Sequence, residues 1–333
     1  MYRMELAKGA KKIVETCAGV KQGENVLIIT DNGRPSSVAE ALAAAAGAVD
    51  GNVTVMVTSP LKLPGQEPGR IVAAAMKEAD VILAATTRTL GHSSALAEAL
   101  KAGARCLALT ECTEQTLTSG AIEADFTALK PLVDLVARRF DAAGRAHVRA
   151  PAGTDVRLDI AERKAATCSG ICHEPGQMIG IPDLEVYIAP IEEKTEGRLV
   201  IDASFSGFGL VEDPVLIEVE NGKVQSIKGG KEAVRLQSLL DSMDDPACRV
   251  IAELAVGLNP KGAVRGNIIE DEGVYGTGHF ALGNNIGFGG TNRAPIHFDM
   301  VYWKPTIELD GEIFMEEGRL VDLDSRFYRL LEN

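Results

Sequence analysis

The residues with the clearest capacity for chemistry are a histidine and an aspartate two positions apart near the end of the chain. His297 and Asp299 lie in IHFDMV, residues 296–301, a pattern typical of a β-strand. Because side chains alternate across a strand, the two project from the same face. Burying them among apolar residues is costly unless they pair or bind a cation. A structural His–Asp hydrogen bond and a metal site are the two interpretations.

Three further residues favour the metal site. His279 occurs in residues 273–290, which contain seven glycines, and glycine lets backbone approach a ligand or adopt positive φ. We therefore expect His279 in a glycine loop built around a ligand. Glu253 lies in the apolar run IAELAVG and Glu185 in LEVYIAP, and a buried glutamate without a partner is rare. Two imidazoles and up to three carboxylates suit Fe(II), Mn(II), Zn(II) or Co(II) and disfavour Cu(I).

These segments resemble the successive motifs of one superfamily. Glu185 in LEVYIAP, Glu253 in AELAVGLNP, His279 in GTGHFALGNN, and His297 and Asp299 in IHFDMVYWKPTIELDGE are similar to the motifs of the thermophilic metallo-aminopeptidases. They also resemble those of a related branch, the 2,5-dihydroxypyridine 5,6-dioxygenases, which open a hydroxypyridine ring. The resemblance runs from about residue 150 to the end, and more weakly through the first half.

The two branches imply different ligands and metals. In the peptidase branch, carboxylates at the places of Glu185 and Glu253 join His279, His297 and Asp299 around two ions, which would be zinc, manganese or cobalt. In the dioxygenase branch a single Fe(II) is held by a Glu, a His and an Asp, which resemble Glu253, His297 and Asp299. Such a set leaves coordination positions open for substrate oxygen atoms and O₂, much as the facial triad does.

One departure separates this chain from the peptidases. That branch carries a tyrosine seven residues beyond the motif histidine, where this chain has Ile286. A hydrogen-bond donor to a developing oxyanion is thereby lost, whereas the apolar side chain suits a flat ring. We expect Fe(II)-dependent ring cleavage of a small hydroxylated N-heterocycle. The alternatives are a two-metal aminopeptidase, a metal-dependent hydrolase of a small cyclic amide, and a metal-stabilised binding protein.

Two other histidines are candidates for a role at the site. His173 lies in a Gly/Pro loop, and an imidazole titrates near neutral pH, so His173 is a candidate catalytic acid or base together with His279. The alternative for His173 is an ordinary surface-loop histidine. His92 is interpreted as a residue that precedes a helix N-cap, with facing the cleft as the alternative.

The first half of the chain must supply an α/β scaffold. Short β-branched runs alternate with Ala-rich stretches, which is typical of a parallel sheet with helices on both faces. Strands are predicted at residues 26–30, 53–58, 81–84 and 106–109, and helices at 1–17, 37–48, 70–79, 94–102 and 131–143, the last with Pro131 in its first turn. The loop at residues 31–37 carries no glycine-rich phosphate motif, so no nucleotide is expected.

The second half changes character. Strands are predicted at residues 155–160, 185–189, 199–205, 215–219 and 224–227, and a helix at 232–243. Asn221-Gly222 is a type I′ hairpin signal. We predict an α/β domain over residues 1–150 and a mainly antiparallel α+β metal-binding catalytic domain over residues 151–333. The metal is expected at the cleft between the two lobes.

The composition restricts the classes of binding partner and the cellular location that we expect for the chain. The 333 residues carry a net charge of −13 without a basic cluster, which argues against nucleic acid as a partner. No apolar run reaches about 18 residues, and residues 1–17 lack the apolar core of a secretory signal. The six cysteines, Cys168 and Cys172 among them, are interpreted as free thiols. We expect a cytoplasmic homo-oligomer that acts on a small molecule and binds no membrane.

Overall fold

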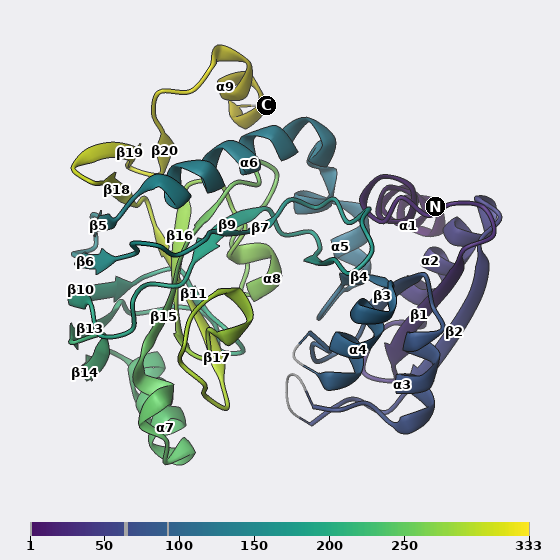
Figure 1. The fold of residues 1–333 in the computed structure, drawn as a ribbon, viewed down its shortest axis with the longest axis horizontal. Coiled ribbons are helices and arrows are strands. Elements are labelled where there is room, and N and C mark those ends of the chain that lie inside the picture. Colours follow the sequence, from purple (N-terminus) through teal and green to yellow (C-terminus); the bar gives the residue numbers. More distant parts are fainter. Residues whose placement is uncertain (1, 63–65, 92, 333) are drawn as a thin grey trace. The chain divides into compact units, whose positions relative to one another are not determined.

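The computed structural model describes residues 2–62, 66–91 and 93–332, which places His92 outside the described residues. The chain divides into two compact units (Figure 1). Unit 1 comprises Met1–Lys130 and Cys168–Asp183, and unit 2 comprises Pro131–Thr167 and Leu184–Asn333. Residue 150, the expected domain boundary, falls between two strands of unit 2. The division into domains at that residue stays a prediction.

Unit 1 is built on a parallel sheet, sheet A, with the strand order β2-β1-β3-β4-β8. Its strands are β1 (Asn25–Asp31), β2 (Asn52–Thr58), β3 (Val81–Ala85), β4 (Arg105–Ala108) and β8 (Met178–Gly180). The predicted parallel sheet is confirmed. The segment that forms β8 comes from beyond residue 150, because unit 1 includes a second stretch of chain.

Helices flank sheet A on both faces (Figure 1). They are α1 (Tyr2–Lys11), a π-helix (Lys12–Cys17), α2 (Ser36–Ala48), α3 (Arg70–Lys77), α4 (Ser94–Ala102), α5 (Glu114–Thr118) and a 3₁₀ turn (Gly120–Glu123). Leu27 and Ile29 of β1 pack in one core with Val72 and Met76 of α3 and Leu96 of α4. Alternate residues of the strand therefore bury against α3 and α4.

The loop after β1 is closed by its own aspartate. The Asp31 carboxylate accepts hydrogen bonds from the Gly33 N–H (2.9 Å), the Thr87 N–H (2.6 Å) and the Thr87 hydroxyl (2.7 Å). These bonds tie the loop after β1 to the loop after β3. The Asp31 carboxylate thus occupies backbone donors of both loops, and the expectation that no nucleotide binds here stays a prediction.

Arg105 at the start of β4 fixes the segment that follows the π-helix. Its guanidinium donates to both carboxylate oxygens of Glu24 (2.9 and 2.7 Å) and to the carbonyl oxygens of Ala18 and Gly19. The Arg105 side chain is 7% exposed and that of Glu24 is 19% exposed. Such a buried, bidentate ion pair is one of the stronger kinds in proteins.

Unit 2 is built on two antiparallel sheets. Sheet B has the order β14-β13-β10-β6-β5-β18-β19-β20, and sheet C the order β12-β11-β17-β16-β15-β9-β7. The strands of sheet B are β5 (Arg145–Arg149), β6 (Asp155–Asp159), β10 (Thr195–Ile201), β13 (Val215–Glu220), β14 (Lys223–Lys228), β18 (Thr306–Leu309), β19 (Glu312–Glu316) and β20 (Arg319–Leu320). Those of sheet C are β7 (Ala166–Cys168), β9 (Glu185–Ile188), β11 (Ser204–Phe205), β12 (Gly209–Leu210), β15 (Ile251–Gly257), β16 (Thr277–Gly283) and β17 (His297–Trp303). The expected α/β lobe followed by a mainly antiparallel lobe is confirmed.

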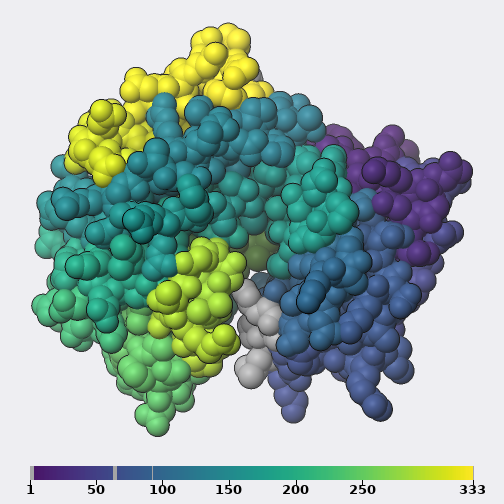
Figure 2. Space-filling view, viewed as in Figure 1, coloured from purple at the N-terminus to yellow at the C-terminus, as the bar shows by residue number. Residues whose placement is uncertain are grey.

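The remaining helical elements begin with α6 (Phe126–Ala142), whose first residues belong to unit 1 and whose others belong to unit 2. Those of unit 2 alone are α7 (Lys231–Met243), α8 (Ile268–Asp271), α9 (Ser325–Glu332) and two 3₁₀ turns (Pro246–Arg249 and Ile286–Phe288). The C-terminal segment, yellow in Figure 2, lies against α6. There Arg139 donates to the carbonyl oxygens of Val321 and Asp322, and the rings of Phe140 and Phe314 meet at 5.3 Å.

Two element predictions are wrong in detail. The single strand expected at residues 199–205 is split, because the chain leaves sheet B after Ile201 and joins sheet C at Ser204. Pro131 lies inside α6 rather than in its first turn. The helix begins earlier because the Asp125 carboxylate accepts the Ala128 N–H at 3.0 Å, as an N-cap does.

Other predictions are confirmed. Asn221 and Gly222 have φ of 49° and 71°, the two positive values that a type I′ turn requires. The six cysteines are free thiols, and all but Cys168 are buried. Within the described residues, no helix has both the length and the apolar character to cross a bilayer.

Replacing Arg105 tests how much its ion pair stabilises the fold. Arg105→Met should lower the free energy of unfolding by about 2 kcal/mol, because it leaves a partly buried carboxylate and two carbonyl groups without their donor. Urea unfolding at pH 7 measures the change. The control is Lys77→Met, which breaks the exposed pair with Glu98 and should cost less than about 1 kcal/mol. Equal losses would contradict the assignment.

The same pair predicts a pH dependence. Burial alone would raise the pKa of Glu24, but the hydrogen bonds and charge of Arg105 hold that pKa below its usual range. A carboxylate whose pKa is lower in the folded than in the unfolded protein stabilises the fold at pH values above its unfolded-state pKa of about 4.3. This stabilisation is lost as the pH falls through the folded-state pKa. The difference between the parent and Arg105→Met should therefore shrink below about pH 4.

Candidate metal centre

The five predicted ligands lie on neighbouring strands of sheet C. Glu185 is on β9, Glu253 on β15, His279 on β16, and His297 and Asp299 on β17. The four strands are adjacent in sheet C in the order β17-β16-β15-β9. The strands thus bring together side chains that lie up to 114 residues apart in the sequence.

The register places these side chains on one face. Ala281 pairs with both Glu253 and Asp299, and directly opposed residues project to the same side. Ala255, two residues after Glu253 and therefore on the same face, pairs with His279. The alanines between the charged groups are small, which leaves room above the sheet for a cluster.

His279 sits within a strand, not in the glycine loop expected from the sequence. β16 spans Thr277–Gly283, and His279 is fully buried at its centre. The glycines mark the ends of the strand. Gly283 has φ of 100°, and a Cβ there would lie 2.2 Å from the Ile296 carbonyl oxygen, so this position accepts only glycine.

The cluster is compact, with Glu253 at its centre. Nε2 of His279 lies 3.1 Å from Oε1 of Glu253 and 3.4 Å from Oε2 of Glu185. Nε2 of His297 lies 3.2 Å from Oε2 of Glu253 and 3.1 Å from Oδ1 of Asp299. The structure therefore brings together all five residues that the sequence predicts as ligands.

The charges set the protonation of the imidazoles. Burial alone would lower the pKa of His279, but the hydrogen bond to Glu253 and the charge of Glu185 raise it to about 9. Burial opposes the charge of His297 likewise, yet Asp299 and Glu253 raise its pKa well above the usual range. In the absence of a metal, protonated imidazoles thus balance the carboxylates.

A sixth residue, Glu272, was missed by the sequence analysis. It directly follows α8 and is buried, and its carboxylate lies within 4.8 Å of ligand atoms of His279 and Asp299. Burial and the charges of Asp299, Glu185 and Glu253 raise the pKa of Glu272 well above its usual range. Glu272 ends the acidic run of residues 270–272, and such runs are usually solvated. The one sequence signal for a role at the site was that this run directly precedes the glycine-rich stretch that contains His279.

The residues fit a divalent metal ion. Nδ1 of His297 lies 2.8 Å from the carbonyl oxygen of Asn284, so a neutral imidazole donates from Nδ1 and directs the Nε2 lone pair toward Glu253 and Asp299. A backbone acceptor of this kind commonly orients metal-binding histidines. Nδ1 of His279 is buried and has no hydrogen-bond partner among the described residues. The contact of Nδ1 with Asn284 thus orients His297 as a ligand, and His279 takes part in candidate ligand groups with Glu185 and Glu253 and with Glu272 and Asp299.

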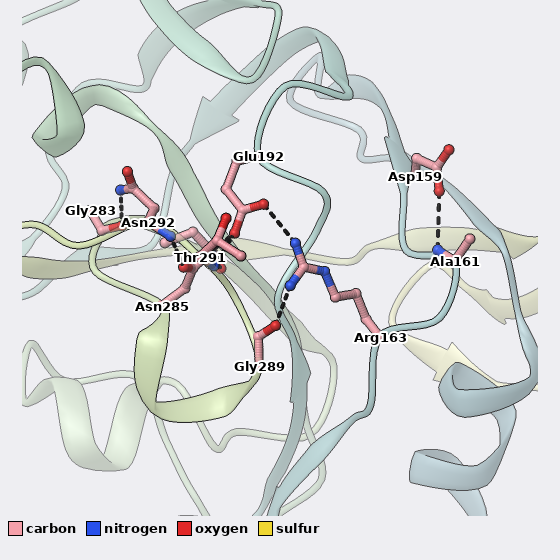
Figure 3. A network of polar contacts seen from close by, with 10 residues as sticks. Asp159, Ala161, Arg163, Glu192, Gly283, Asn285, Gly289, Thr291 and Asn292 are labelled. Carbon is pink, nitrogen blue, oxygen red and sulfur yellow. Dashed lines mark hydrogen bonds and ion pairs between the residues drawn. The ribbon is translucent and has the colours of Figure 1, made fainter.

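The loop between β16 and β17, residues 284–296, is held from outside sheet C (Figure 3). The Glu192 carboxylate accepts the Thr291 N–H (2.5 Å), the Asn285 side-chain amide (3.0 Å) and the Arg163 guanidinium (2.6 Å). Arg163 also donates to the Gly289 carbonyl oxygen. Burial alone would raise the pKa of Glu192, but these donors lower it, so the carboxylate is charged at neutral pH.

The other catalytic candidate, His173, belongs to unit 1. It is exposed, and its Nε2 lies 2.9 Å from the carbonyl oxygen of Thr16. Its ring lies so close to Gly19 that a Cβ there would be 2.7 Å away. A catalytic role for His173 stays a prediction.

Comparison with known proteins adds the family. Residues 5–322 match the family model described as 2,5-dihydroxypyridine 5,6-dioxygenase. A relative of that name from Pseudomonas putida is 27% identical over 261 residues, which cover 74% of this chain and 72% of the relative.

Two solved structures share the fold. The 2,5-dihydroxypyridine dioxygenase from Pseudomonas putida aligns with a TM-score of 0.82 and 21% identity over 97% of this chain and 98% of that one. Wild-type AmpT from Thermus thermophilus aligns with a TM-score of 0.70 and 19% identity, over 97% of this chain and all of that one.

The family match and the buried cluster of imidazoles and carboxylates identify the chain as an enzyme. It belongs to the 2,5-dihydroxypyridine 5,6-dioxygenase family, whose model covers most of its length. The predicted resemblance to this superfamily, nearer the dioxygenase branch, is confirmed.

Truncating the ligands on β17 tests the metal site. His297→Ala and Asp299→Ala should each remove the metal without unfolding the chain, because the strand is held on both sides by its neighbours. Metal content per chain and circular dichroism provide the two measurements. His147→Ala is the control, since His147 pairs with Asp155 in sheet B. Full metal content in either β17 variant would refute the assignment.

Proposed function

We propose that this enzyme is an Fe(II)-dependent dioxygenase that opens the ring of a dihydroxypyridine or a similar small hydroxylated N-heterocycle. The family and the name of the Pseudomonas putida relative support the reaction type. The oxygen and nitrogen ligand atoms of Glu253, His297 and Asp299 support a metal such as iron.

The observation that carries the proposal is the orientation of His297. With Nδ1 bonded to the Asn284 carbonyl oxygen, Nε2 faces one oxygen of Glu253 and one of Asp299 at 3.2 and 3.1 Å. Glu253, His297 and Asp299 are therefore the proposed ligands of one ion. When bound, Fe(II) would supply the redox chemistry and the open coordination positions that a dioxygenase reaction needs.

The remaining polar residues support these three ligands. His279 donates from Nε2 to Oε1 of Glu253 at 3.1 Å and so fixes the orientation of that carboxylate. Glu185 lies on the other side of the same Nε2 at 3.4 Å. The side chains of His297 and Asp299 are 21% and 14% exposed, against 1% for His279, so a substrate would approach from the side of β17.

A second candidate is a two-metal hydrolase, which would use zinc, manganese or cobalt. Its support is a pair of overlapping ligand sets, one of Glu185, Glu253 and His279 and the other of Glu272, His279 and Asp299. Sets that share a residue are compatible with two neighbouring ions. The likeness to AmpT concerns the fold alone and does not decide between the candidates.

Glu185→Gln separates the two candidates. If Glu185 only supports one ion, the variant should keep that ion with affinity weakened by about 10- to 100-fold, as changes around the ligands typically do. If Glu185 binds a second ion, one of two ions is lost. Metal titration after anaerobic purification gives the stoichiometry. Glu193→Gln, an exposed neighbour along the same segment, is the control.

Activity gives a further test of the proposal. With Fe(II) and 2,5-dihydroxypyridine we expect O₂ consumption that matches the loss of substrate. With zinc, cobalt or manganese we expect negligible hydrolysis of aminoacyl p-nitroanilides, since Ile286 cannot donate a hydrogen bond to an oxyanion. Release of p-nitroaniline that His279→Ala abolishes would favour the hydrolase instead.

A further inference from the structure

Phe288 brings an aromatic ring to the proposed metal ligand His297. The two ring centroids are 5.8 Å apart, with an interplanar angle of 88°. The same Phe288 ring meets Tyr187 at 5.2 Å and 78°. Both contacts are edge-to-face, which is a favourable geometry for aromatic pairs. Phe288 therefore connects side chains from two separate strands.

The strand order locates this ring above the cluster. Tyr187 is on β9 and His297 on β17, and the strands between them are β15 and β16. Those two strands carry Glu253 and His279 on the same face. A ring that touches both Tyr187 and His297 thus lies over the part of the sheet where the ligands are.

The position of Phe288 is fixed by the surrounding loop. The next residue, Gly289, accepts a hydrogen bond from Arg163 through its carbonyl oxygen. Asn285 at the start of the turn bonds to Glu192. Its side-chain oxygen also accepts the Asn292 N–H at 2.8 Å. These bonds hold the loop at both sides of Phe288 without any contribution from a ligand.

Ile286, where the peptidases carry a tyrosine, does not take this role. It is 41% exposed, and the ring contact to His297 comes from Phe288 two residues later. An apolar surface for a flat ring at Ile286 itself stays a prediction. Among the described residues the aromatic surface beside His297 is supplied by Phe288.

We propose that Phe288 is a specificity-determining residue that forms the wall against which a planar hydroxylated aromatic ring packs when it binds beside His297. This inference rests on the proposed function. An aromatic pair adds affinity beyond the area it buries, whereas an acyclic ligand with the same oxygen donors gains nothing from the ring. Phe288 would thus select flat rings over flexible chelating molecules.

The test compares two ligands on the Co(II)-loaded protein. 4-Nitrocatechol is a planar aromatic chelator, and acetohydroxamate is an acyclic one. Phe288→Leu should weaken binding of 4-nitrocatechol by about five- to tenfold and change that of acetohydroxamate by less than about twofold. Phe288→Tyr, which keeps the ring, should restore the affinity for 4-nitrocatechol. Thr291→Ala, at an exposed position in the same loop whose backbone N–H makes the bond to Glu192, should change the binding of neither ligand.

Metal content is measured for every variant. Equal weakening of both ligands, or loss of cobalt, would show that Phe288 only positions His297 and would overturn the proposal. Unchanged binding of 4-nitrocatechol, or no binding by the parent protein, would overturn it as well. The dissociation constants do not depend on turnover. Failure to consume O₂ with 2,5-dihydroxypyridine would therefore count against the proposed function and leave this test intact.

Discussion

Three carboxylates and two imidazoles project from one face of sheet C, and the carboxyl group of Glu272 reaches the same cluster from the end of α8. So many acidic groups are stable there only with positive charge among them. Without a metal, the imidazoles supply that charge, which is why the pKa values of His279 and His297 are raised. A divalent ion meets the same requirement and releases those protons. The excess of carboxylates on this face thus favours the binding of a cation.

That constraint also explains the scaffold around the cluster. Glu253 and His279 lie on central strands whose residues are all buried, so neither group can relax toward solvent. The alanines in register between the charged residues keep the cluster open above the sheet. Antiparallel pairing of β15, β16 and β17 then fixes the spacing of the ligands along and across the strands.

How far the sequence predicts this site depends on the range of the interactions involved. His297 and Asp299 are two residues apart, and strand alternation alone places them on one face. Glu185 and Glu253 stand out as carboxylates within apolar runs, but the resemblance was needed to group them with His297 and Asp299, since no local pattern shows that distant strands will be neighbours. Glu272 was missed because its partners come from β16 and β17 and its own segment reads as a solvated acidic turn.

The same reasoning applies to the fold. The strands β1 to β4 and the helices α2, α3 and α4 of unit 1 follow from local periodicity, and their predicted positions agree closely with the structure, whereas α5 and β8 were not predicted. The split of residues 199–205 does not, because only the tertiary structure decides which sheet each half joins. His279 was predicted in a loop because glycines surround it. They lie at the ends of its strand and direct the chain into its turns.

The hydrogen bonds that hold residues 284–296 have an evolutionary consequence. Glu192 and Arg163 hold the loop mainly through hydrogen bonds to its backbone. His297, in contrast, is positioned by strand β17 and by the carbonyl oxygen of Asn284. Mutations at the tip of the loop can therefore alter the residue at position 288 without moving the ligands. Enzymes that descend from this chain could therefore come to accept different substrates while they keep the same metal ligands.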